Sequence, residues 1–392
     1  MKDEKYMKAY VIGAGITGIT TAYSLAKRGV DVTVIEAQPY AAMMTSYANG
    51  GQLSVSNSDV WTTWSNVFKA AKWVLRKDAP LLINPSFSLS KYRWLYKFLE
   101  TTATGKAEIN TKETIKIGLA AREIYFKIAE EEKIDFDLTK KGILHFYKDE
   151  KYFEQAKRSC QLYWDLGVDR ELLTANQVRS IEPSLGDSTI LGGVYTPGDA
   201  NGDIHKFCIN LSEVLKNKYN VKFIYNFKLS SLDKVSSNDT IVLCAGVESA
   251  KLSRLINDPL DIYPVKGYSI TIDVGTSDSA PTVSLLDDEA KIVSSRLGNR
   301  FRVAGTAEIN GYNYDIRKDR VDPLVSWVKN NFNGISTEHV VPWAGLRPMT
   351  PNMLPIVRRS KVPNIWYNTG HGHLGWTLGA ATAETIAENI LG

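Results

Sequence analysis

The chain begins with a short apolar strand that runs directly into a glycine-rich turn. Residues 8–12 read Lys-Ala-Tyr-Val-Ile, Gly-Ala-Gly-Ile-Thr-Gly follows at 13–18, and a helical stretch then extends to Arg28 and Gly29. A second apolar run at 30–35 ends on Glu36. A glycine turn between a strand and a helix, with an acid after the next strand, is the dinucleotide-binding fingerprint. This pattern predicts a nucleotide-binding α/β unit over the first 60 residues.

Each part of this fingerprint serves phosphate or ribose binding. Gly13 permits the tight turn, Gly15 lets a pyrophosphate approach the backbone, and Gly18 lets the helix pack closely on the strand. The helix N-terminus offers free N–H groups to the phosphates. Glu36, followed by Ala37, lies where an acid would bind the adenosine ribose, which argues against NADP. The alternative is a glycine-rich turn in an ordinary α/β protein.

A second strand–glycine turn–helix unit lies near the C-terminus. A strand is expected at 364–367, glycines follow at 370, 372 and 375, and a small-residue helix is expected at 378–390. The start of this helix can direct N–H groups at a second electron-rich group, such as the pyrimidine edge of a flavin. FAD is long enough to reach from the first glycine turn to the last. The two loops therefore predict FAD rather than NAD alone, although the second glycine cluster could also form a simple helix cap.

Strand and helix patterns predict two interleaved domains. Helices are expected at 109–133, 150–166, 203–216 and 321–332, a buried strand at 240–246, and an antiparallel sheet within 264–309. The predicted fold class is α/β (α+β overall), with an FAD-binding, doubly wound, Rossmann-like domain and an interleaved antiparallel-sheet substrate domain. The expected segments are 1–60, 170–255 and 340–392 for the FAD-binding domain, and 61–169 and 256–339 for the substrate domain.

Composition excludes several other classes of protein. The formal net charge of +4 over 392 residues is too small to imply nucleic-acid binding. Cys160, Cys208 and Cys244 are far apart, match no metal-binding spacing and fit a reducing compartment. No apolar run is long enough to span a membrane, and the charged N-terminus leads almost at once into the first strand. We therefore expect a cytoplasmic protein without a metal site.

Four segments of the sequence resemble one family closely and in the same order. They are Thr45–Ser54 (TSYANGGQLS), Lys266–Ser269 (KGYS), Gly345–Pro351 (GLRPMTP), and Asn368–Gly372 (NTGHG) with Leu374–Thr377 (LGWT). The chain resembles the catalytic (small) subunits of D-amino acid dehydrogenases essentially end to end. These belong to the wider FAD-dependent group that includes D-amino acid oxidase, glycine oxidase and sarcosine oxidase.

The resemblance implies oxidation of a D-amino acid at its Cα–N bond. Hydride would pass from Cα to flavin N5, and the imino acid would hydrolyse to a 2-oxo acid and ammonia. Electrons would then pass to a quinone or respiratory carrier. The FAD is expected to be noncovalent, because residues 345–358 contain no cysteine, where sarcosine-oxidase relatives attach their flavin. Together with the glycine loops, the resemblance gives these cofactor candidates: Gly13, Gly15, Gly18, Glu36, Ala37, Thr45, Ser46, Gly50, Gly51, Leu53, Leu229, Gly246, Gly370, Gly372, Gly375, Trp376 and Thr377.

Three residues are candidates for the substrate site. A carboxylate substrate needs a fixed cation, and a guanidinium group suits it because it binds through two points. Arg347 is the candidate, since the matching arginine of glycine oxidase holds the carboxylate; the alternative is a structural salt bridge. Tyr268 could donate to the same carboxylate, cover the flavin, or be an ordinary aromatic in a strand. His371 lies in the flavin loop, where a plain structural role is at least as favoured as a catalytic one. A metal-binding role for His371 together with His373 is disfavoured, because no Cys or carboxylate accompanies them.

Residues 61–98 form an unusual segment with seven Lys or Arg, one acid (Asp78) and four tryptophans. An amphipathic element at the inner face of the cell membrane would have this composition. Core-packed helices with solvated basic faces would have it too, and this second interpretation is favoured.

The chain also departs from the family. Six residues precede Met7, where the first strand of the family usually starts, Arg358 replaces a glycine, and the sequence ends soon after the last helix. Three other functions stay open: an oxygen-using oxidase of glycine, sarcosine or a related secondary amine, a noncatalytic FAD-binding subunit, and an NAD-only dehydrogenase.

Overall fold

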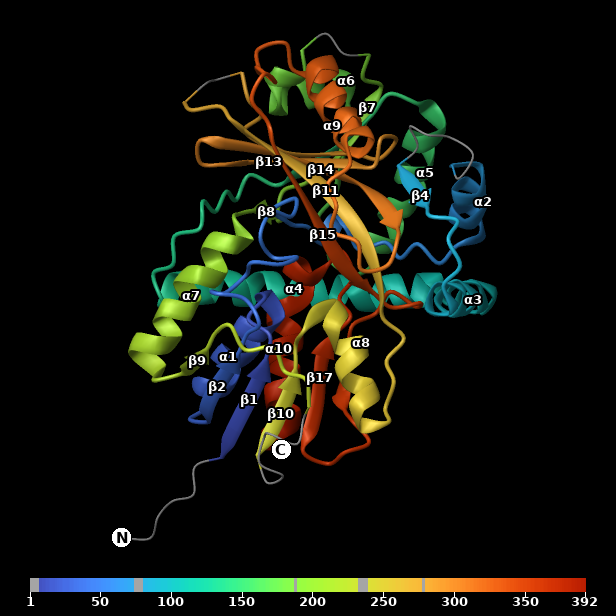
Figure 1. Cartoon of the computed structure of the whole chain (residues 1–392). Helices are drawn as coiled ribbons and strands as arrows, with labels where there is room; N and C mark the ends of the chain where they lie inside the picture. The colour runs from blue at the N-terminus through green and yellow to red at the C-terminus, as the bar shows by residue number, and fades with distance from the viewer. Residues whose placement is uncertain (1–6, 74–79, 187–188, 232–238, 277–278) are drawn as a thin grey trace.

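The computed structural model describes residues 7–73, 80–186, 189–231, 239–276 and 279–392. One half is built around a mainly parallel sheet, which contains β1 near the N-terminus and carries the C-terminal helix (Figure 1). The other half is built around a large, mainly antiparallel sheet. The predicted fold class is confirmed.

The parallel sheet is the predicted doubly wound unit. Its strand order is β16-β17-β10-β1-β2-β9, and every neighbouring pair except β16 with β17 is parallel. Because parallel strands share a direction, the carboxyl ends of β1, β2 and β10 meet at one edge, where such sheets bind nucleotides. The strands are β1 (Lys8–Ile12), β2 (Asp31–Ile35), β9 (Lys222–Ile224), β10 (Thr240–Leu243), β16 (Ile356–Arg359) and β17 (Ile365–Thr369).

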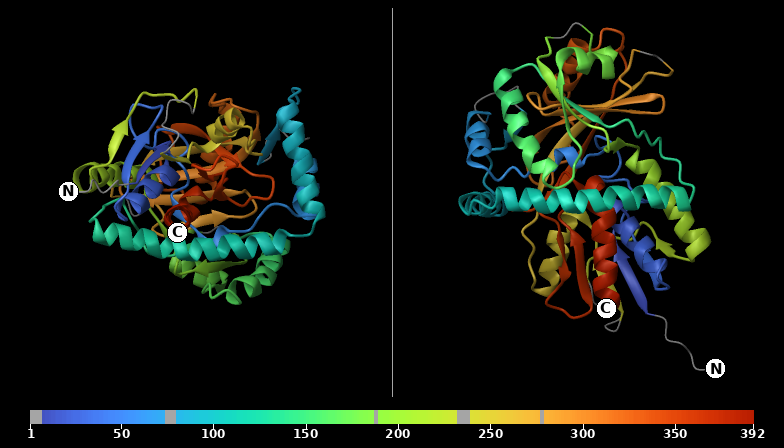
Figure 2. Two further views of the ribbon diagram at one scale, coloured as in Figure 1. Left: turned by 90° about the horizontal axis from the view of Figure 1, so that it is seen from below. Right: turned by 180° about the vertical axis from the view of Figure 1, so that it is seen from behind.

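Both faces of the parallel sheet are covered, as the apolar strands predict. Val11 and Val34 face a core made with four helices, whereas Ile12 and Leu243 face a second core on the opposite side with α8. Helix α4 crosses α10 and spans the width of the molecule (Figure 2). The helices are α1 (Ile16–Ala26), α4 (Ala107–Glu131), α7 (Ile204–Tyr219), α10 (Gly375–Leu391) and α8 (Ser249–Leu252).

The large sheet has the order β15-β11-β14-β13-β12-β5-β7-β6, and β4 pairs with β14. Leu324 and Val328 of α9 pack on Phe301 and Val303 of β14, which forms a second large core. The strands are β4 (Leu81–Ile83), β5 (Ile143–Tyr147), β6 (Glu171–Thr174), β7 (Gly192–Thr196), β11 (Tyr263–Asp273), β12 (Ser284–Asp287), β13 (Ile292–Leu297), β14 (Arg300–Ile309) and β15 (Val341–Met349). Its helices are α5 (Glu150–Trp164), α6 (Ala175–Ile181) and α9 (Lys318–Asn331). The antiparallel sheet expected within 264–309 is thus present and extends well beyond that range.

The segment boundaries expected from the sequence do not follow the two sheets. Strands β6 and β7 lie within 170–255 and β15 lies within 340–392, yet all three pair in the large sheet. Helix α4 lies within 61–169 but packs on α10. A strand pattern reveals that a strand exists and says nothing about which sheet it joins, so the expected segments could not follow the two sheets.

Short elements connect the two halves. β3 (Gln52–Leu53) pairs with β8 (Ala200–Asn201). Single turns of 3₁₀ helix lie at Val55–Asn57, Pro183–Leu185, Gly246–Glu248 and Ser253–Ile256.

None of the described helices is both long enough and apolar enough to cross a membrane.

The aromatic segment 61–98 lies beside the large sheet, and its residues 74–79, including Asp78, lie outside the described residues. Helix α2 (Trp64–Trp73) has no buried residue. The exposed fractions of Trp64 and Phe68 are 50% and 64%. Helix α3 (Leu89–Ala103) buries Lys91, Trp94 and Thr102. The favoured interpretation as core-packed helices therefore does not hold for α2, since the side chains of Trp64 and Phe68 face water.

Candidate active site

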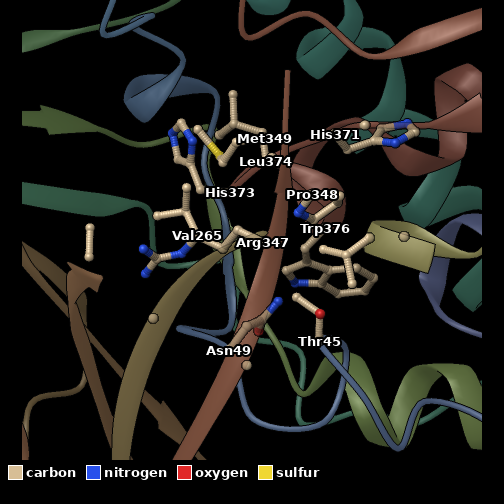
Figure 3. A pocket seen from close by; sticks show the side chains of 18 of the residues that line it. Thr45, Asn49, Val265, Arg347, Pro348, Met349, His371, His373, Leu374 and Trp376 are labelled. Carbon is tan, nitrogen blue, oxygen red and sulfur yellow. The ribbon is translucent and has the colours of Figure 1, made fainter. Parts of the chain in front are cut away.

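A cavity of about 1560 Å³ lies where the two sheets face each other. This volume exceeds the roughly 300–1,000 Å³ of ordinary ligand pockets and is suited to a dinucleotide together with a small substrate. Its walls come from both glycine-rich loops, the loop after β2, the ends of β10 and β15, and the segment around α2 and α3. Figure 3 shows part of this wall around Arg347, His373 and Trp376.

The first glycine loop forms one end of the cavity. Gly13 has a φ of +104°, and a Cβ on Gly18 would lie 1.8 Å from the carbonyl oxygen of Gly13. Both positions therefore require glycine, as predicted from the fingerprint. A Cβ on Gly15 would meet only Ser46 Oγ, at 3.4 Å. Gly15 lines the cavity at the start of α1, where backbone N–H groups and the helix dipole favour a phosphate.

Glu36 lies at the carboxyl end of β2 and lines the cavity with Ala37. Its carboxylate accepts hydrogen bonds from the backbone N–H groups of Ala14, at 2.6 Å, and Gln38, at 2.9 Å. These contacts fix the acid beside the glycine turn, where the fingerprint places a ribose.

The loop after β2 lies between the two sheets. Thr45 Oγ1 donates to Leu346 O at 2.7 Å, and Ser46 Oγ accepts from the Ile16 N–H at 3.1 Å. The candidate cofactor residues in the cavity wall are Gly13, Gly15, Glu36, Ala37, Thr45, Ser46, Gly50, Gly51, Leu229, Gly246, Gly370, Gly372, Gly375, Trp376 and Thr377. Gly18 and Leu53 are the exceptions. Gly18 lies against the carbonyl group of Gly13, and the side chain of Leu53 packs in the core around α1 and α7, so neither residue lines the cavity.

The second glycine loop and the start of α10 form the other end of the cofactor region. Helix α10 begins at Gly375, three residues earlier than expected, and no side chain caps its N-terminus. The first N–H groups of a helix have no partner within the helix. The indole Nε1 of Trp376 is also buried without a hydrogen-bond partner. A bound ligand with oxygen acceptors would satisfy these donors, so the residues present fit the pyrimidine edge of a flavin.

Arg347 occupies the cavity wall opposite this loop. It lies on β15, and one guanidinium N–H donates to Thr306 O at 3.0 Å. No carboxylate among the described residues forms an ion pair with it. Burial alone lowers the pKa of Arg347 to about 10, so the group stays cationic at neutral pH. The salt-bridge alternative therefore finds no support in the described part of the chain.

Tyr268 lies on β11 and also lines the cavity. Its hydroxyl donates to Glu308, which also pairs with the fully buried Lys266 at 3.3 Å. Burial has the largest effect on the pKa of Tyr268 and raises it, and the hydrogen bond to Glu308 raises it further. This contact corrects the expectation that the hydroxyl is free for a substrate carboxylate, because a buried carboxylate already accepts its proton.

His371 and His373 have different surroundings. His371 Nε2 lies 2.8 Å from Thr382 Oγ1, which ties the loop to α10. His373 stacks on Trp61, with ring centroids 4.7 Å apart, and faces the charge of Arg347. Burial lowers the pKa of both imidazoles to about 3, and Arg347 contributes at His373, so both are neutral. The Nε2 atom of His373 is buried without a partner.

His373 and Trp61 were not recognised as site residues from the sequence. The available signal was the position of His373 in the flavin loop, two residues after His371. Its neighbour Trp61 lies more than 300 residues earlier, so sequence spacing could not pair them. No group of His, Cys, Asp or Glu in the described residues has a metal-binding arrangement.

A family model described as FAD dependent oxidoreductase matches residues 8–389. The chain belongs to the FAD-dependent oxidoreductase family. This membership makes it a flavoenzyme and identifies FAD, rather than NAD alone, as the cofactor for the two glycine loops.

Individual relatives agree with this assignment. D-amino acid dehydrogenase 3 from Mesorhizobium japonicum is 49% identical over 399 residues, covering 97% of this chain and 96% of that protein. A D-amino acid dehydrogenase from Paramagnetospirillum magneticum is 38% identical over 403 residues, covering 98% of this chain and 95% of that protein. Glycine oxidase from Bacillus cereus has a similar fold, with a TM-score of 0.76 and 19% sequence identity. The match covers 99% of this chain and 95% of the glycine oxidase chain.

Proposed function

We propose that this flavoenzyme is a D-amino acid dehydrogenase that converts D-amino acids to 2-oxo acids and ammonia. The observation that supports it most directly is Arg347, a cation in the cavity wall with no carboxylate partner among the described residues. An α-carboxylate is the natural partner for a guanidinium group held in this way. Full-length similarity to proteins named D-amino acid dehydrogenase supports the same substrate class.

The residues of the chain bind and orient, whereas the flavin supplies the redox chemistry by accepting a hydride. The start of α1 and Glu36 would hold the pyrophosphate and ribose of FAD, and the start of α10 would bind its pyrimidine edge. The FAD is held without a covalent bond, since the described cysteines are free and buried and none lies in 345–358. Arg347 binds the substrate carboxylate, which fixes Cα relative to the cofactor.

The electron acceptor is proposed to be a quinone or respiratory carrier. The test measures 2-oxo acid and ammonia formed from matched D- and L-amino acids, with a soluble quinone analogue or with oxygen. We expect products from the D-enantiomers only, formed faster with the quinone. Rapid turnover on oxygen with steady hydrogen peroxide would instead identify an oxidase, for example of glycine, sarcosine or a related secondary amine.

We also propose that α2 and the start of α3 rest on an anionic membrane surface. Trp64 and Phe68 on α2 and Phe87 before α3 are exposed by 50%, 64% and 84%. Arg93 and Lys97 share a single carboxylate, Asp261, so this region keeps an excess of positive charge. Exposed aromatics beside basic side chains are typical of interfacial elements.

Co-sedimentation with anionic vesicles tests this surface. We expect binding at low salt and release at high salt, because charge attraction is screened over about 10 Å at 0.1 M. Replacing Trp64 and Phe68 together by serine should abolish binding, whereas Leu172→Ser, at an exposed residue of β6, should not. Equal binding of both variants, or none by the unmodified protein, would contradict the proposal.

A further inference from the structure

A row of hydrogen bonds between buried side chains leads away from the cofactor end of the cavity. Ser54 lines the cavity, and its N–H donates to Thr377 Oγ1 at 3.3 Å, at the start of α10. Ser54 Oγ lies 3.2 Å from Ser56 Oγ, which lies 3.1 Å from Nε2 of His145. Ser56 is fully buried and His145 is 3% exposed. The row therefore joins the flavin loop to β5 through the protein interior.

The far end of this row reaches charged groups that also line the cavity and are partly exposed. His145 Nδ1 lies 3.2 Å from Asp288 Oδ2, and the hydroxyl of Tyr147 donates to the same oxygen at 2.7 Å. Lys291 lies 3.4 Å from the other carboxylate oxygen, and its side chain is 44% exposed. A proton released beside Asp288 can thus pass to water.

The hydrogen bonds share one direction. An ionised carboxylate only accepts, so Nδ1 of His145 carries the hydrogen and Nε2 accepts from Ser56. Ser56 then accepts from Ser54, and every donor points outward. Burial alone would raise the pKa of Asp288, but the hydrogen bond from His145 and the charge of Lys291 hold it well below its usual range. Asp288 is therefore ionised and accepts the hydrogen bond from Nδ1 of His145.

Other charged groups also surround His145. Asp59 lines the cavity and accepts a hydrogen bond from Tyr163 OH at 3.0 Å. Burial raises the pKa of Asp59, and the charge of Arg170 only partly offsets this increase. Arg170 stacks on the ring of Tyr163 at 3.8 Å. Lys291 beside Asp288 and Arg170 beside Asp59 balance these two carboxylates. The fully buried Asp199 accepts from the Ser56 N–H at 2.9 Å.

The Ser–His–Asp order is also that of hydrolases, in which the serine attacks a carbonyl group. Ser56 does not suit that role, because it is fully buried and absent from the cavity wall. We propose instead that Ser54, Ser56 and His145 form a relay that carries a proton from the cofactor end of the cavity to the water beside Asp288, whose carboxylate orients His145. This inference rests on the proposed function.

The proposed reaction produces the proton that such a relay would carry. The bound substrate has the form R–CH(NH₃⁺)–COO⁻. Loss of one proton from the ammonium group and of a hydride from Cα, which a bound flavin would accept, would leave the iminium R–C(=NH₂⁺)–COO⁻. The cofactor would keep the hydride with both bonding electrons, whereas the proton would have to leave the site. The imidazole can pass it by accepting at Nε2 and releasing at Nδ1.

Anaerobic stopped-flow mixing of the FAD-loaded protein with a D-amino acid tests the relay. A pH-indicator dye reports proton release, and the flavin absorbance reports reduction. In the unmodified protein, both signals should change together. In Ser56→Ala and His145→Gln, proton release should be at least about tenfold slower, a modest value for the loss of a positioned proton-transfer group. Added imidazole should restore proton release in His145→Gln, since His145 borders the cavity.

The exposed His339 provides the control, and His339→Gln should behave like the unmodified protein. Prompt proton release in Ser56→Ala and His145→Gln, with normal flavin bleaching, would overturn the relay and leave the proposed function intact. Absence of bleaching by any D-amino acid in the unmodified protein would overturn both.

A measurement without substrate separates a relay from a purely structural contact. Nitrogen-15 NMR of the histidine side chains, with His145→Gln as the assignment control, should show the Nδ1-protonated tautomer for His145. Replacing Asp288 by asparagine should change that tautomer population. A predominant Nε2-protonated form would reverse the donor direction at Ser56 and overturn the proposal.

Discussion

The guanidinium group of Arg347 lies against the α-carbon of Gly267 on the neighbouring strand. A Cβ placed on Gly267 would come within 2.4 Å of Nη2 and 2.5 Å of Cζ of Arg347. Strands β11 and β15 are paired at this point, and Arg347 is opposite Val265. The absence of a side chain at Gly267 therefore provides the space in which the guanidinium faces the cavity.

Gly267→Ala should displace this guanidinium, because 2.4 Å is closer than a Cβ can approach another heavy atom. We expect at least about tenfold weaker binding of the best D-amino acid, equivalent to about 1.4 kcal/mol. FAD content should stay unchanged. Substrate dissociation constants from the dependence of the flavin bleaching rate on substrate concentration provide the measurement. An unchanged constant would mean that Arg347 does not hold the carboxylate in its present position.

Arg347→Lys keeps the charge and removes the two-point geometry. The specificity constant should fall by a factor corresponding to about 1–3 kcal/mol, the range for a hydrogen bond to a charged group. Steady-state kinetics with the best D-amino acid, normalised to FAD content, measures this loss. A specificity constant equal to that of the unmodified protein would place the carboxylate site elsewhere.

The nucleotide loop and the pair of glycine turns could be predicted from the sequence because each is a local pattern. Gly13, Gly18 and Glu36 lie within one strand–helix–strand unit, and the structure places them as the fingerprint requires. Helix α4 could be located for the same reason, because its apolar residues recur at helical spacing within the helix itself.

The remaining relationships depend on distant parts of the chain. Ser56 meets His145 although the two lie 89 residues apart, and Trp61 stacks on His373 although more than 300 residues separate them. Tyr268 is engaged by Glu308, a residue of the paired strand β14. No spacing rule encodes such pairings, so the candidate roles of Tyr268 and Leu53 could be corrected only from the structure.

Gly15→Val should abolish FAD binding while leaving the fold in place. The position lies at the start of α1 in the cavity wall, where an added Cβ would have only Ser46 Oγ nearby, so a valine side chain would fill the space of the pyrophosphate. Acid precipitation followed by absorbance of the supernatant measures bound, noncovalent FAD, and circular dichroism checks the fold. Purification of this variant with a full complement of FAD would contradict the role assigned to the loop.

His371→Gln should make the protein less sensitive to acid. The pKa of His371 is lowered to about 3, so below about pH 6.5 the unfolded chain binds a proton that the folded chain does not. The stability contributed by neutral His371 is present above this pH and is lost as the pH falls toward the folded pKa. The loss is about 1.4 kcal/mol per pH unit for one proton.

Thermal unfolding in excess FAD at about pH 7 and about pH 5 measures this difference. The drop in Tm on acidification should be smaller in His371→Gln than in the unmodified protein, whereas the exposed-residue variant His339→Gln should show the full drop. Equal drops in all three proteins would show that His371 is not held neutral by the fold.

Anaerobic mixing of the purified, FAD-loaded protein with matched D- and L-amino acids tests the central claim most directly. The proposed geometry places one enantiomer with its carboxylate on Arg347 and its Cα toward the flavin. We therefore predict complete bleaching of the flavin absorbance by D-amino acids, without any partner protein, and none by the L-enantiomers. A flavin that stays oxidised with every D-amino acid, as in a noncatalytic FAD-binding subunit, or that bleaches equally with both enantiomers, would contradict it.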